Sequence, residues 1–209
     1  MKNILDFLVK GGIIMIPLFL CSVTALAVVI EKAVTLRRRR IIVPEVVSVL
    51  DNVKGAGDFA LALAVCEKHR GSFANMARLA LENRALPREE LKESLGDQGR
   101  QEVHRLGRGL GVLETVAGIA PLLGLLGTVL GILKVFKVIS VMGVGQATAL
   151  AGGISEALIT TIAGLFIGIP ALVAYNYYSD RTESLVLEME NHSNRLLNKI
   201  NSLQPGAGG

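Results

Sequence analysis

The chain has 209 residues; 51% of them are hydrophobic, 4% are aromatic and none is tryptophan. This composition is unusual for a soluble domain of that length and indicates insertion into a lipid bilayer. The formal net charge of +4 comes from basic residues that are mostly dispersed among acidic ones, so it does not indicate nucleic-acid binding.

The first long apolar segment predicts a transmembrane helix. No charged residue occurs from Gly11 to Ile30, and at about 1.5 Å per residue such a helix reaches about 30 Å, the thickness of the hydrocarbon layer. A cleaved signal peptide is the alternative, because Lys2 and Lys10 precede the segment and Ala25-Leu26-Ala27 resembles a cleavage site. Since the apolar run continues past that site, we expect an uncleaved first span.

A basic cluster follows this span directly. It consists of Arg37, Arg38, Arg39 and Arg40. Positive residues at the end of a span are typical of the cytoplasmic side, so we interpret the cluster as a topology anchor.

The next part of the chain is charged and amphipathic, which predicts a helical cytoplasmic region. Pro44 suits the first turn of one helix, and a second helix is expected from Asp58, as its N-cap, to Arg70. A third helix is predicted around Phe73, and Pro87 begins a fourth. No group of residues in this region indicates a catalytic domain.

Two further apolar segments predict a second and a third transmembrane helix. The short connection between them contains Gly143 and Gly145, so the two helices are expected to be antiparallel neighbours. The fold predicted is therefore an all-α membrane protein with three transmembrane helices extended by long cytoplasmic helices.

The distribution of Lys and Arg predicts the orientation, because these residues gather at one side of three alternating spans. We expect Lys134 and Lys137, on the other side, to reach the outer headgroups or to meet an acid of a partner protein. The predicted segments are a periplasmic N-terminus (1–12), the first span (11–36), a cytoplasmic helical region (37–109), the second span (110–139), a periplasmic turn (140–149), the third span (150–179) and a cytoplasmic C-terminal helix and tail (180–209).

Glu156 is the one carboxylate between Thr115 and Ser179. An ionised carboxylate in hydrocarbon is costly, so such groups usually pair, become neutral or line a water-filled path. Glu156 is therefore the main candidate for an ion pathway. The alternative is a helix-end acid that reaches the outer headgroups.

Three threonines are further candidates. Thr128 and Thr161 are equally far from the middle of the connecting turn, so in an antiparallel hairpin they lie at similar depth, and Glu156 lies roughly 8 Å nearer the periplasm. Thr160 is four residues from Glu156 and shares its helix face. Hydrogen bonding within their own helices is the alternative for all three.

Glycines recur at a spacing that favours close helix packing in the second and third spans. The glycines are Gly124, Gly127, Gly131, Gly164 and Gly168.

No nucleotide-binding motif occurs, and the cysteines and histidines show no metal-ligand spacing, so we expect neither a cofactor nor a metal.

Two stretches resemble the MotA/TolQ/ExbB proton channel family, and most closely its ExbB and TolQ members. They are APLLGLLGTVLGI (residues 120–132) and GISEALITTIAGL (residues 153–165), the latter followed by Ile169-Pro170-Ala171. The resemblance implies an inner-membrane pentamer around an ExbD/TolR-like single-helix subunit, which uses the proton motive force to drive a TonB/TolA-like transducer. It also implies that Thr128, Glu156 and Thr161 are the polar pore residues, so it selects Thr161 where the shared helix face selected Thr160.

Two alternatives stay open at this point. A MotA-like flagellar stator would have four spans where this chain has three. A passive helical scaffold would anchor a complex without moving ions. No nucleophile, base and orienting residue are grouped as in an enzyme.

Overall fold

The computed structural model describes residues 11–55, 57–143 and 147–203, and within these ranges all regular structure is helical, as predicted. The chain forms two compact units. The first unit comprises Met1–Glu31 and Gly109–Tyr177, and the second comprises Lys32–Arg108 and Tyr178–Gly209. The predicted pentameric ring stays a prediction.

Three helices of the described residues are long and apolar enough to cross a membrane. They are α2 (Met15–Thr35), α8 (Leu110–Met142) and α9 (Ala147–Leu203). Many large apolar side chains on them are exposed, including Ile16 at 63% and Phe166 at 79%. Apolar surface of this extent is what a lipid bilayer or neighbouring helices would cover, which supports a multi-pass membrane protein.

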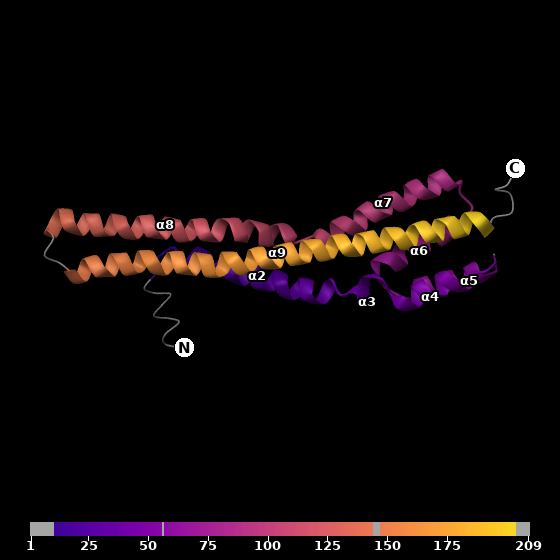
Figure 1. The fold of residues 1–209 in the computed structure, drawn as a ribbon, viewed down its shortest axis with the longest axis horizontal. Helices are drawn as coiled ribbons and strands as arrows, with labels where there is room; N and C mark the ends of the chain where they lie inside the picture. The colour runs from indigo at the N-terminus through magenta and orange to yellow at the C-terminus, as the bar shows by residue number, and fades with distance from the viewer. Residues whose placement is uncertain (1–10, 56, 144–146, 204–209) are drawn as a thin grey trace. The chain divides into compact units, whose positions relative to one another are not determined.

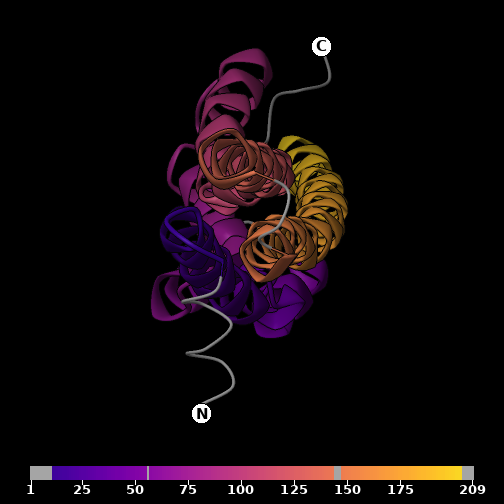
Figure 2. The ribbon, with the colours of Figure 1, turned by 90° about the vertical axis from the view of Figure 1, so that its left-hand side faces the viewer.

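Helices α8 and α9 lie side by side in the first unit (Figures 1 and 2). Their backbones come so close that an added Cβ at Gly164 would lie 2.5 Å from the carbonyl oxygen of Ala120. At Gly124 it would lie 2.9 Å from the carbonyl oxygen of Thr160. Only glycine permits this approach, so small residues determine how the hairpin packs.

Among its described residues, the second unit contains five shorter helices, the end of α2 and the last part of α9. Helix α4 has Pro44 at its first turn, and α6 buries the predicted apolar face that includes Phe73. The predicted N-cap Asp58 is wrong, because Gly57 occupies that position and Asp58 accepts hydrogen bonds from the backbone N–H groups of Lys54 and Gly55. The helices are α3 (Arg38–Ile41), α4 (Pro44–Asn52), α5 (Asp58–Lys68), α6 (Ser72–Glu82) and α7 (Arg88–Gly107).

An apolar core joins these helices to the last part of α9. The Arg38 side chain of the basic cluster forms an ion pair with Glu188 of α9, and its Nε lies 2.9 Å from one carboxylate oxygen. This hydrogen bond and the charge of Arg38 hold the pKa of Glu188 below its usual range. Fully enclosed members of the core include Ile42, Val46, Phe73, Leu81, Leu185 and Ile200.

Candidate functional site

The carboxylate of Glu156 is paired within the chain. Lys134 of α8 places its Nζ 2.6 Å from one oxygen of Glu156 and 2.7 Å from the other. The Glu156 side chain is 20% exposed and that of Lys134 is 60% exposed. The sequence predicts that Lys134 reaches the outer headgroups or meets an acid of a partner protein. The close approach of α8 and α9 instead gives it an acid of its own chain.

A third segment comes against the same carboxylate. Gly12 precedes α2 and has a φ of +67°, and an added Cβ there would lie 2.1 Å from Oε1 of Glu156. Both the left-handed backbone and the lack of space require glycine at this position. Glu156 is thus enclosed by α9, by Lys134 of α8 and by the backbone before α2.

A cavity of about 260 Å³ opens beside the ion pair. Its charged lining residues within the described part of the chain are Lys134, Lys137 and Glu156. Its other walls are mainly apolar. The remaining lining residues are Gly11, Ile13, Ile14, Gly127, Leu130 and Leu133.

The Thr128 and Thr161 hydroxyls form a second polar pair between α8 and α9, where they are hydrogen-bonded to each other. Thr128 Oγ1 also lies 3.2 Å from the carbonyl oxygen of Ala157, and Thr161 Oγ1 lies 3.2 Å from that of Gly124. Each hydroxyl has one hydrogen to donate and lone pairs to accept, so the bonds of this pair can be arranged in more than one way. Such a pair can orient water or pass a proton.

Thr160 has a different environment from Thr161. It is 1% exposed, and its hydroxyl donates to the carbonyl oxygen of Ala157 at 2.8 Å. It packs on Gly127, where an added Cβ would lie 2.3 Å from Oγ1. The structure therefore brings Thr161 to Thr128 and directs Thr160 into the helix contact.

The five glycines singled out in the sequence all face the contact between α8 and α9. An added Cβ at Gly131 would lie 2.8 Å from the Gly153 carbonyl oxygen, and at Gly168 it would lie 2.7 Å from Cγ of Pro121. With Gly124, Gly127 and Gly164, these positions form the small-residue face of the hairpin.

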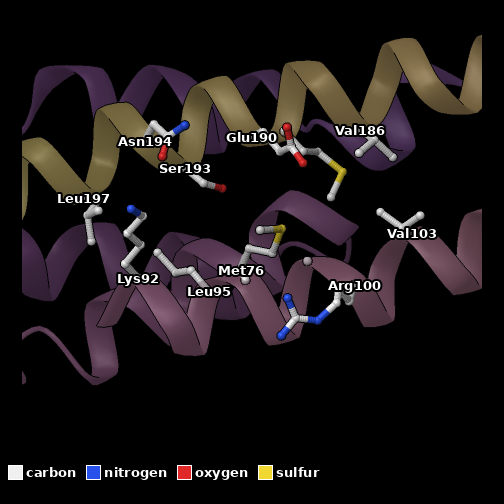
Figure 3. A pocket seen from close by; sticks show the side chains of 13 residues that line it. Met76, Lys92, Leu95, Arg100, Val103, Val186, Glu190, Ser193, Asn194 and Leu197 are labelled. Carbon is white, nitrogen blue, oxygen red and sulfur yellow. The ribbon is translucent and has the colours of Figure 1, made fainter. Parts of the chain in front are cut away.

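A second cavity, of about 420 Å³, lies in the second unit between α7 and α9 (Figure 3). Met76 of α6 and Leu95 of α7 give it apolar walls, and Lys92, Arg100 and Glu190 contribute charge. The buried Ser193 hydroxyl has no hydrogen-bond partner among the described residues. In the same part of the chain, no three His, Cys, Asp or Glu side chains are grouped to hold a metal.

Sequence reasoning missed Lys134 as the partner of Glu156, although a signal for it was present. Lys134 and Glu156 lie almost equally far from the middle of the turn, as Thr128 and Thr161 do. Applying the same hairpin rule to charged residues would have found the pair. Gly12 had no such signal, because nothing in the sequence places the segment before α2 beside α9.

Residues 68–191 match the MotA/TolQ/ExbB proton channel family. The chain is 37% identical to the ExbB-like 1 protein of Synechocystis sp., over 83% of this chain and 69% of that protein. It is 35% identical to the biopolymer transport protein ExbB of Xanthomonas campestris pv. campestris, over 68% of this chain and 54% of that protein. It is 42% identical to the Tol-Pal system protein TolQ of Pseudomonas aeruginosa, over 41% of this chain and 37% of that protein.

Proposed function

The chain belongs to the MotA/TolQ/ExbB proton channel family, and from this premise we propose that it conducts protons through the membrane as part of an energising complex of the ExbB/TolQ type. Glu156 would take up the proton, and the Thr128–Thr161 pair would form the next polar level of the path. The complex would convert the proton motive force into mechanical work on an envelope protein.

The observation that carries this proposal is the placement of two polar pairs inside an otherwise apolar hairpin. Lys134–Glu156 and Thr128–Thr161 both lie between α8 and α9, separated by roughly 8 Å along the helices. Polar and charged groups on membrane helices are costly in hydrocarbon, so their presence at two depths favours a conduction role over a purely structural one.

We further propose the partners and the topology that the family resemblance implies. Several copies, five by resemblance, would surround a single-helix subunit of the ExbD/TolR type and would act on a TonB/TolA-like transducer. The connection between α8 and α9 would face the periplasm, so that Glu156 would meet an incoming proton before the threonines. Native mass spectrometry after mild extraction should show several copies, and a monomer would exclude the pore.

The proposal is tested by Glu156→Gln, which retains the shape and most of the hydrogen-bonding capacity but cannot ionise. We expect the variant to reach the membrane and to assemble at native levels, while proton-driven uptake or envelope function falls to background. Both readouts are measured at equal protein amounts in cells that lack the native copy.

Glu183→Gln is the matched control, because Glu183 is an exposed acid of the same helix in the second unit. It should assemble and work normally. If Glu156→Gln also supports proton-driven uptake or envelope function at the native rate, the Lys134–Glu156 pair only stabilises the hairpin and the chain is a scaffold.

A further inference from the structure

Lys134 occupies the position at the Glu156 carboxylate that an incoming cation would need. Its ammonium lies within 2.7 Å of both oxygens, so the positive charge is shared between them. The Gly12 backbone closes a further side of Oε1. A metal cation would have to displace the ammonium before it could contact either oxygen.

The surroundings of the pair offer little to a metal cation in return. A desolvated cation needs several oxygen ligands, whereas the described cavity walls contribute apolar side chains and a second ammonium, from Lys137. The Thr128 and Thr161 hydroxyls lie roughly 8 Å further along the helices. Glu156 is therefore the one side-chain oxygen ligand among the described residues that line this cavity, and a sodium ion bound there would have to keep water molecules as its other ligands.

A proton has different requirements. It forms an O–H bond to a single carboxylate oxygen and needs no further ligands. Once the carboxylate is neutral, Lys134 loses its counter-charge, and its flexible four-carbon stem can carry the ammonium to more polar surroundings. The side chain is 60% exposed, so its movement is not blocked by packing within the chain.

We propose that Lys134 is the specificity-determining residue of this channel: as a tethered counter-cation it denies the Glu156 carboxylate to metal cations and leaves it accessible to protons. This inference rests on the proposed function, since it assigns the ion selectivity of the same site. Lys134 acts through Glu156 and is a positioning residue, whereas Glu156 is the group that binds the ion.

The test is sodium binding to the purified protein, measured with radioactive sodium in a choline chloride background. The native protein should show no saturable binding that depends on Glu156. Lys134→Met leaves the carboxylate without its counter-ion, so we expect saturable sodium binding that depends on Glu156. Its half-saturation should lie at least about tenfold below the highest sodium concentration at which the native protein shows none. Lys134→Arg should resemble the native protein, and Lys134→Met combined with Glu156→Gln should lose the binding.

Lys137→Met is the matched control, because it removes the same charge from the same cavity lining but leaves both carboxylate oxygens paired. Like the native protein, Lys137→Met should show no saturable sodium binding that depends on Glu156. Equal sodium binding by Lys137→Met and Lys134→Met would overturn the proposal, as would no gain in Lys134→Met. Saturable sodium binding by the native protein that is lost in Glu156→Gln would also overturn the proposal.

If Lys134→Met fails to fold, Lys134→Gln provides the same test with a hydrogen-bond donor retained, and its failure to bind sodium would equally overturn the proposal. Sodium binding is measured without any proton-driven work. A native rate for Glu156→Gln in cells would therefore refute the proposed function and leave the sodium result to be judged separately.

Discussion

At the scale of single residues, neighbouring threonines of α9 have separate environments. The Thr161 hydroxyl meets Thr128 across the hairpin, while Thr160 donates to its own helix and packs on Gly127. The helix face shared with Glu156 selected Thr160, because a helical wheel of α9 carries no information on the residues of α8. The difference depends on which residue of α8 is opposite, and that follows from the exact depth of the hairpin.

This difference predicts unequal effects of two similar substitutions. Thr161→Val replaces a hydroxyl by a methyl group of similar size and breaks the pair with Thr128, so we expect proton-driven activity to fall severalfold. Thr160→Val removes a hydroxyl that bonds within its own turn, and activity should stay near native. Both variants are compared by transport or envelope assays at equal membrane levels. Equal losses would mean that the Thr128–Thr161 pair has no special role.

At the scale of helices, most of the elements could be predicted from the sequence. Apolar length indicated α2, α8 and α9, and Pro44 and the apolar face around Phe73 indicated α4 and α6. The prediction of Asp58 as N-cap was wrong, because its carboxylate accepts hydrogen bonds from backbone N–H groups that precede the helix. The residue patterns that indicate helix starts do not predict such a turn. The Lys134–Glu156 pair was missed because each residue was interpreted on its own helix.

The close contact of α8 and α9 makes a prediction about stability. Gly164→Ala would place a methyl group 2.5 Å from a backbone oxygen of Ala120, and such overpacking costs about 1–3 kcal/mol. Gly118→Ala on α8 meets nothing within 4 Å of the added Cβ, so it should be neutral or slightly stabilising. Unfolding in mixed detergent measures both, and equal effects would contradict the proposed packing.

The ion pair between α3 and α9 predicts a dependence on pH. Because the pKa of Glu188 is lowered in the folded protein, mainly by its hydrogen bond from Arg38, the pair stabilises the fold above the ordinary carboxylate pKa. This contribution is lost as the pH falls through the lowered value. Unfolding curves are measured between about pH 6 and pH 3. The free energy of unfolding should be higher for the native protein than for Glu188→Gln near pH 6, and the two values should converge near pH 3.

Glu183→Gln is the control for that series, since Glu183 is an exposed acid on the same helix. The free energy of unfolding of Glu183→Gln should differ little from that of the native protein, and the difference should not change systematically with pH. A constant gap between native protein and Glu188→Gln across the range would show that the pair does not act through the charge of the carboxylate.

At the scale of the whole molecule, the proposed topology can be tested by cysteine labelling. Gly145→Cys should react with an impermeant maleimide from the periplasm, whereas Asn83→Cys and Ser202→Cys should need membrane disruption. Gly145 lies outside the described residues. Native Cys66 should interfere little, because it is buried and its pKa is raised to about 11. Replacing Cys21 provides the background, and the reverse pattern would overturn the orientation.

The central claim is that protons cross the membrane past Glu156. It is tested most directly by proton flux into vesicles that contain the purified complex of the chain with its co-purifying subunits, driven by an imposed potential and followed with a trapped pH-sensitive dye. The account predicts flux for the native complex and for Glu183→Gln, and background flux for an equally assembled Glu156→Gln complex. Native flux through the Glu156→Gln complex would contradict it.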